Sequence, residues 1–95
     1  MSTKPVPVVL FRLGQIVATP NALAHITPDD ILTGIQRHQA GDWGDLDAPD
    51  RQANDRGLID GDRLVSVYHS VGGLKFYIIT EWDRSVTTVL LPEDY

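Results

Sequence analysis

Cysteine is absent from this chain of 95 residues. No disulfide can therefore staple the fold, and no thiolate can serve as a nucleophile or a metal ligand. No apolar run is long enough to span a bilayer, and the first residues lack the apolar core and cleavage site of a signal peptide. These absences predict a cytoplasmic protein that does not enter a membrane.

Basic residues are also few, since 8 Lys and Arg stand against 13 Asp and Glu, and the net charge is -5. They are scattered along the chain, whereas proteins that hold nucleic acid by its phosphates need a basic patch. We therefore expect nucleic acid to be an unlikely partner. The chain also has no HExxH, no EF-hand loop, no phosphate-binding glycine loop and no GxSxG turn. We expect no metal and no cofactor.

The length and an apolar content of 42% are typical of one domain with a single core, spanning residues 1–95, with residues 1–5 expected to be flexible. The last third, residues 62–91, predicts a meander of three antiparallel strands. Its turns are expected at Gly72-Gly73 and Asp83-Arg84. With two-residue loops, Val67 pairs with Ile78 and Ile78 with Val89.

That register sorts the side chains onto two faces. Val65, Val67, Phe76, Ile78, Val89 and Leu91 lie on an inward face, together with His69, Val71 and Leu74. Tyr68, Lys75, Tyr77, Glu81 and Thr88 lie on an outward face, together with Ser66.

Upstream of the meander, the segments Val6–Leu13 and Gln15–Ala18 are strand-like and predict a hairpin or one bent edge strand, for which Pro5 and Pro7 are suited. Thr19 and Thr27 precede prolines and predict helix starts, and Asp47 predicts a third. The expected helices cover residues 21–26, 28–40 and 48–56, with Gly41 and Gly57 as stops and Ile31, Leu32, Ile35 and His38 as the buried stripe of the second. The fold class is α+β: an N-terminal strand or hairpin, two to three short helices, then an antiparallel sheet with the helices on one face.

The stretch Gly41-Asp42-Trp43-Gly44 is the most unusual in the chain. Trp43 either folds back onto the core or stands exposed as the anchor of a recognition loop, with Asp42 beside it. His38, one turn earlier, is either a structural partner for the last helical carbonyls or a general base.

The outward sheet face supplies the best candidates for binding: Tyr68, Lys75, Tyr77, Glu81 and Thr88. Two aromatic side chains on a polar face can hold a partner's side chains. The alternative is a wetted face partly covered by the N-terminal segment.

Several of these pieces together resemble a family of short bacterial proteins found on plasmids and integrated elements. They are Gly41–Gly44, Asp50, Asn54, Ile79–Glu81, Asp83–Ser85, Thr87-Thr88 and Leu91–Glu93. The resemblance covers the chain from about Gly14 onward, and this chain departs from the pattern at Trp82. The resemblance implies a link to mobile DNA and no particular activity.

The expected architecture also resembles the superfamily of small ribonucleases and toxins that includes barnase, RelE-type toxins and EndoU nucleases. That resemblance implies metal-free RNA cleavage by a base, His38 or Glu81, and a cation, Lys75 or Arg84, with Tyr77 and Thr88 positioning the RNA.

Three functions follow as hypotheses. The first is a non-enzymatic accessory protein of mobile elements that binds another protein and also forms a homodimer. The second is a metal-independent ribonuclease or toxin. The third is a DNA mimic that inhibits a defence enzyme. That mimic would need phosphate-like spacing of its acids, which are Asp42, Asp45, Asp47, Asp50, Asp60 and Asp62.

Overall fold

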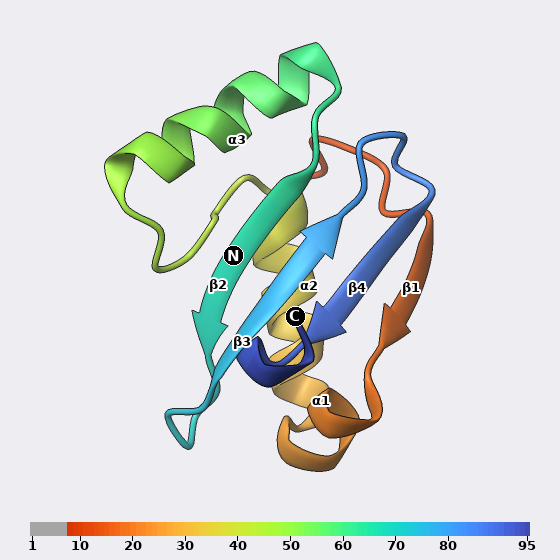
Figure 1. Ribbon diagram of the computed structural model, residues 1–95, viewed down its shortest axis with the longest axis vertical. Coiled ribbons are helices and arrows are strands. Elements are labelled where there is room, and N and C mark those ends of the chain that lie inside the picture. Colours follow the sequence, from red (N-terminus) through yellow and green to blue (C-terminus); the bar gives the residue numbers. More distant parts are fainter. Residues whose placement is uncertain (1–7) are drawn as a thin grey trace, which may run out of the picture.

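A computed structural model of the protein describes residues 8–95, so the expectation for residues 1–5 lies outside the described part. The elements follow one another as β1 (Gln15–Ala18), α1 (Pro20–His25), α2 (Pro28–Gln39), α3 (Ala48–Asp60), β2 (Leu64–His69), β3 (Lys75–Thr80), β4 (Val86–Leu90) and the 3-10 helix η1 (Pro92–Asp94). The α+β class is thus confirmed (Figure 1).

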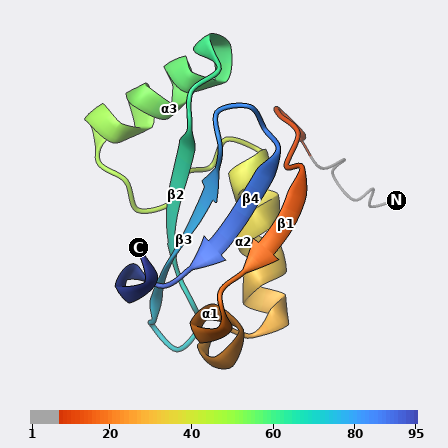
Figure 2. The same cartoon turned by 45° about the vertical axis from the view of Figure 1, so that its right-hand side comes forward.

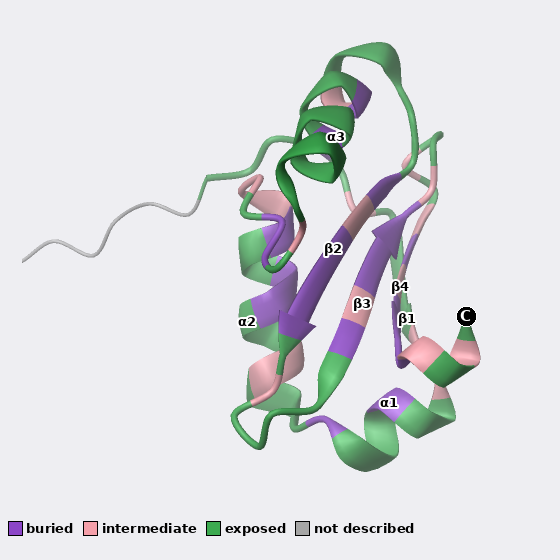
Figure 3. Cartoon of the chain, turned by 60° about the vertical axis from the view of Figure 1, so that its left-hand side comes forward, coloured by how far each residue is buried: buried purple, intermediate pink, exposed green. Residues whose placement is uncertain are grey.

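The strands form one sheet in the order β1-β4-β3-β2. The β2–β3 and β3–β4 pairs are antiparallel, as expected, but β1 joins β4 in parallel, so the sheet is mixed. Helix α2 lies on one side of the sheet, with α1 below the lower end of the sheet (Figure 2), and η1 lies on the other side (Figure 3). We call the α2 side the helix face and the η1 side the open face.

The expected first strand is partly wrong. Residues 8–13 are not a strand, while Gln15–Ala18 is the predicted edge strand, and Pro5 and Pro7 lie outside the described residues. The Leu10 N–H donates to the Gln39 carbonyl at 2.9 Å, so this segment crosses the end of α2 instead of entering the sheet.

The predicted helix starts are confirmed. The side chains of Thr19, Thr27 and Asp47 accept hydrogen bonds from the first turns of α1, α2 and α3. The predicted end of α3 at Gly57 is wrong, because α3 continues to Asp60 and ends at Gly61, whose φ of 76° is left-handed. Gly57 instead allows close packing, since a Cβ there would lie 3.1 Å from Leu64 Cδ2.

The stripe expected on α2 is right for Ile35 and His38, which are buried, and wrong for Leu32, which is exposed. Gly34 takes the place against the sheet. A Cβ at Gly34 would lie 3.0 Å from Ile78 Cδ1, so the missing side chain lets α2 approach β3 closely.

The register of the first hairpin differs by one residue from the prediction. Tyr68 pairs with Phe76 and Val67 with Tyr77, because the loop contains three residues, 71–73, and not two. Gly73 adopts the left-handed φ of 88° that such a loop needs at its last position. The shift turns Tyr68 and Ser66 onto the helix face and turns Val65 and Val67 away from it.

The second hairpin follows the prediction, with Thr80 opposite Thr87 and Ile78 opposite Val89. Phe76, Ile78 and Val89 therefore lie on the helix face as expected. They form the main core with α1 and α2 residues and with Tyr68.

Candidate functional site

His38 lies at the centre of a buried chain of polar side chains. Its Nδ1 is 2.5 Å from Ser66 Oγ, and its Nε2 is 2.9 Å from Thr80 Oγ1. Thr80 Oγ1 is 2.7 Å from Thr87 Oγ1, which in turn donates to the Leu13 carbonyl at 2.7 Å. We call these four side chains the His38 chain.

The carbonyl at its end sets the direction of every hydrogen bond in the chain. Thr87 donates to Leu13, so Thr80 must donate to Thr87 and must accept from His38 Nε2–H. Ser66 then donates to Nδ1, which defines a neutral imidazole with its proton on Nε2.

Burial lowers the pKa of His38 to about 3, and the positive charge of Arg84 acts in the same direction. Both ring nitrogens are occupied and the side chain is fully buried. His38 is therefore a structural residue, and the hypothesis that it is a general base is wrong for this fold.

Trp43 is buried, so the hypothesis of an exposed anchor is also wrong. Its ring packs against Phe11 at a centroid distance of 6.1 Å, and its Nε1–H donates to Asp55 Oδ1 at 2.9 Å. Asp42 is exposed but forms an ion pair with Arg37, with 2.7 Å between Oδ2 and Nε. The Arg37 guanidinium is the main cause that lowers the pKa of Asp42.

Tyr68, predicted to be a binding residue, lies under the helices and donates from its hydroxyl to the Asp42 carbonyl. Burial raises its pKa above the ordinary value. The sequence prediction for Tyr68 is wrong because it depended on the slipped register.

Arg84 is also a structural residue. Its guanidinium donates to the carbonyls of Asp62 at 2.6 Å and Gly57 at 3.0 Å, which secures the turn in which Arg84 holds a φ of 62°. Lys75 lies six residues from Glu81 along β3, which corresponds to about 20 Å. The structure therefore keeps Lys75 apart from Glu81, and it commits the Arg84 guanidinium to backbone carbonyls.

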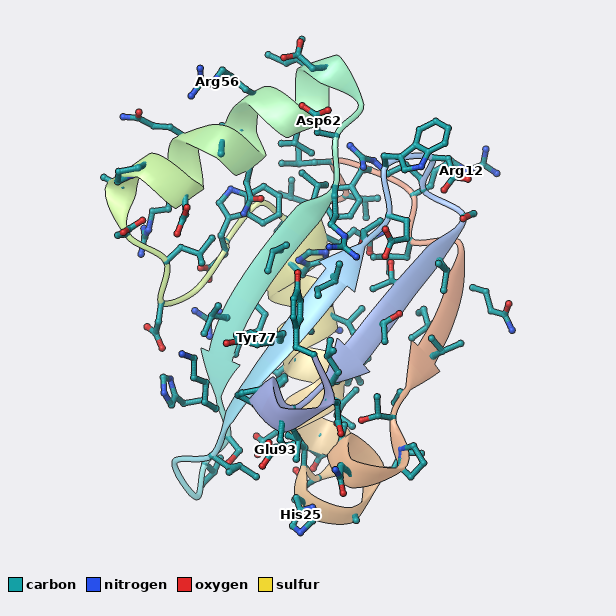
Figure 4. The ribbon with its side chains drawn as sticks, in the orientation of Figure 1. Arg12, His25, Arg56, Asp62, Tyr77 and Glu93 are labelled. Atoms are coloured by element: carbon teal, nitrogen blue, oxygen red, sulfur yellow. The ribbon has the colours of Figure 1, made fainter. Side chains whose placement is uncertain are left out.

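Four of the predicted binding residues do share the open face. Lys75, Tyr77 and Glu81 follow one another on β3 and its continuation, and Thr88 is the neighbour of Ile79 on β4. The Lys75 ammonium lies 5.6 Å from the Tyr77 ring centroid. Figure 4 shows Tyr77 near the middle of the sheet, on the same side as Glu93 of η1.

The C-terminal segment partly covers this face and adds two residues that the sequence analysis missed. The Tyr95 ring meets Tyr77 edge-on at 5.9 Å, and Arg63 donates to the Tyr95 hydroxyl at 3.1 Å. Arg63 also binds both carboxylate oxygens of Glu81, at 3.2 and 3.3 Å. Beneath the segment, Ile79 and Leu90 are buried although they point away from the helices.

Asp94 fastens the segment to the start of α1. It accepts from Thr19 Oγ1 at 2.6 Å and from Asn21 Nδ2 at 2.8 Å. These hydrogen bonds lower the pKa of Asp94, the bond from Thr19 most strongly. The partners are 75 residues apart, so no local pattern could have predicted the contact.

Hollows lie on either side of the exposed Tyr95 ring. One, of about 270 Å³, contains Arg63, Glu81, Thr88 and Asp94 in its wall, and another, of about 380 Å³, is lined by Val65, Tyr77, Pro92 and Tyr95. A third, of about 370 Å³, continues from Tyr77 past Lys75 and His69 to a group of acids. We call this continuous surface the tyrosine surface.

The acids of the DNA-mimic hypothesis fall into separate groups. Asp45, Asp47 and Asp50 border the tyrosine surface, and the negative charge of Asp47 raises the pKa of Asp50. Asp60 is the last residue of α3, about 18 Å along the helix from its start, and Asp62 follows the Gly61 cap. Figure 4 shows Asp62 at that end. Figure 4 also places Arg12 and Arg56 at different corners of the molecule, so these cations form no shared patch.

Among residues 8–95, no group of three His, Asp or Glu side chains is placed to hold a metal ion. No helix in the described part of the chain is long and apolar enough to cross a membrane. Comparison with protein families, curated proteins and solved structures finds no match for this chain.

Proposed function

We propose that this protein is a non-enzymatic accessory protein of mobile genetic elements that acts by binding another protein through the tyrosine surface. The observation that carries the proposal is the pair Tyr77 and Tyr95, set edge to face beside hollows on the open face of the sheet. Tyr95 keeps 69% of its surface exposed. Tyrosines with an apolar ring and a polar tip are enriched at protein interfaces.

The charges around the tyrosines favour a partner with basic side chains. Asp45, Asp47 and Asp50 lie at one end of the surface, and Glu81 and Asp94 at the other. The net charge of -5 adds a long-range attraction to such a partner. The association should therefore weaken as salt is added.

The test is capture of the partner from host cells by immobilised protein, with the wild type and two variants compared. Tyr95→Ala should weaken retention about tenfold or more, because central aromatic residues dominate interface energies. Trp82→Ala is the matched control, since Trp82 is an exposed aromatic residue at the β3–β4 turn. Equal retention by both variants, or no captured protein, contradicts the proposal.

The ribonuclease alternative is separated from this proposal by a growth assay. A ribonuclease arrests growth on expression, and Glu81→Gln would relieve the arrest while Trp82→Ala would not. A binding protein leaves growth of the expressing cells unchanged for all three chains.

A further inference from the structure

Strand β1 is the outer strand of the sheet and pairs with β4 on one side only, within the described part of the chain (Figure 1). The Gln15 N–H donates to the Ser85 carbonyl at 2.9 Å and the Thr19 N–H to the Val89 carbonyl at 3.0 Å. Backbone groups of successive residues alternate between the two sides of a strand. Ile16 and Ala18 therefore direct their N–H and C=O groups away from the sheet.

The opposite edge, β2, is closed by the rest of the fold. The Asn54 side-chain oxygen Oδ1 accepts from the Val65 N–H at 3.2 Å, and the Asn54 Nδ2–H donates to the Val65 carbonyl at 2.7 Å. Val67 bonds to the Trp43 carbonyl and to the Asp45 N–H. Within residues 8–95, one edge of the sheet is thus satisfied by its own chain and the other is open.

Although β1 is short, its described residues carry neither of two features that commonly protect edges from pairing, a charge or a proline. Natural edge strands are blunted by charges, prolines or bulges. Residues 15–18 read Gln-Ile-Val-Ala, with no charge and no proline, and Ile16 is 50% exposed. This strand has the chemistry of a strand that pairs.

We propose that β1 pairs antiparallel with β1 of a second copy of this chain, across a two-fold axis at Val17. Ile16 then lies opposite Ala18 of the second copy, and each such pair exchanges two backbone hydrogen bonds. Every outward backbone group of Ile16 and Ala18 obtains a partner. The surface is separate from the tyrosine surface, so the inference does not depend on the proposed function.

Three features favour a second copy over an unrelated peptide. The pattern of donors and acceptors is symmetric about Val17, as an isologous contact requires. The pairing sets a large side chain, Ile16, against a small one, Ala18, and brings no like charges together in a protein of net charge -5. The combined sheet then ends on two closed β2 edges, which stops the assembly at a dimer.

A cysteine introduced at the axis tests the register. Val17 faces Val17 of the second copy in a non-hydrogen-bonded pair, with about 4.5 Å between Cα atoms, a distance that a disulfide can span. Because the chain has no cysteine, Val17→Cys carries a single thiol. We expect mild oxidation of the folded protein to yield a disulfide-linked dimer.

The control is Val71→Cys, which places a thiol at a position that is 94% exposed in the β2–β3 loop. It should form at least tenfold less dimer under the same conditions. Equal crosslinking of the two variants, or none for Val17→Cys, overturns the proposal.

A charge at the edge tests the association without any covalent bond. Ile16→Lys should raise the dimer dissociation constant at least about tenfold in sedimentation equilibrium, because two new ammonium groups flank the pairing. Ile59→Lys makes the same chemical change at an apolar residue on α3 that is 86% exposed, and should leave the constant within about twofold. Circular dichroism checks that both variants are folded.

A wild-type protein that is monomeric up to a concentration of about 1 mM contradicts the proposal, since pairing between copies would then be weaker than any useful affinity. Equal loss of the dimer in both lysine variants would place the contact elsewhere and also overturn it.

Discussion

Acid should destabilise this fold through His38. In the native state the pKa of His38 is lowered to about 3, whereas an unfolded histidine titrates near its ordinary pKa of 6.5. Below pH 6.5 the unfolded chain therefore binds a proton that the native protein does not. The free energy of unfolding falls by about 1.4 kcal/mol for each pH unit, and by about 3 kcal/mol in total at pH 4.5.

The direction follows from linkage. Above pH 6.5 both states hold a neutral imidazole and His38 adds no pH dependence. Below it, stability is lost until the native state also takes up the proton near pH 3. Three carboxylates also have pKa values lowered from the ordinary value of 3.8: Asp42, Asp83 and Asp94. The stability that they contribute is therefore lost mainly below the window of pH 6.5 to 4.5.

Urea unfolding at constant ionic strength between pH 7.5 and 4.5 measures this loss. His38→Gln should be less stable than the wild type at pH 7 but should have a nearly flat profile, because the titrating group is gone. Trp82→Ala, at an exposed side chain that does not titrate in this range, should keep the wild-type slope. If His38→Gln loses as much stability as the wild type between pH 6.5 and 4.5, the assignment of the slope to His38 is refuted.

Three further predictions concern the same scaffold. Gly44→Ala should lower the free energy of unfolding by about 3 kcal/mol or more, because Gly44 has a left-handed backbone and an added Cβ would lie only 2.0 Å from the Val67 carbonyl oxygen. Gly61→Ala has a similar φ but no atom within 4 Å of the added Cβ, so it should lower the free energy by only about 1 kcal/mol. Chemical denaturation of the two variants measures the difference. Asn54→Ala should lower the free energy of unfolding by about 1–3 kcal/mol, because it leaves the Val65 N–H and C=O at the β2 edge unpaired. The control is Ala53→Gly at the neighbouring position of α3, which should lower the same free energy by about 1 kcal/mol through helix propensity alone. Trp82→Phe should leave a tryptophan emission that acrylamide quenches little, since Trp43 is buried; strong quenching would contradict that burial.

The sequence predicted those features whose cause is local. The starts of the three α-helices follow from Thr19, Thr27 and Asp47, each of which binds a backbone N–H in its own first turn. The second hairpin follows from its turn, and it sets the side on which Lys75 and Tyr77 lie. Those two residues were therefore found on the open face from sequence alone.

The first hairpin was predicted one residue out of register because its loop contains three residues and not two. The two-residue loop expected at Gly72-Gly73 places Ser66 outward, yet Ser66 is fully buried, since His38 supplies its hydrogen-bond partner. An apolar-versus-polar sorting cannot anticipate a partner from a helix 28 residues away. The slip of one residue then carried Tyr68 to the wrong face.

The open face was only half predicted for a related reason. Tyr95 lies there because Asp94 binds Thr19 and Asn21 near the other end of the chain, and the Tyr95 hydroxyl then accepts from Arg63. Such contacts depend on the completed fold and leave no periodic signal. The same holds for Trp43, whose burial depends on Phe11.

The fixed direction of the His38 chain has a consequence for how the molecule assembles. Its members come from α2, β2, β3 and β4, and it ends at Leu13, just ahead of β1. If the first hairpin were shifted by one residue, Ser66 would point to solvent. The buried Nδ1 of His38 would then have no hydrogen-bond donor. The His38 chain is fully hydrogen-bonded only when all five segments are correctly aligned. We therefore expect these segments to fold cooperatively, in one step.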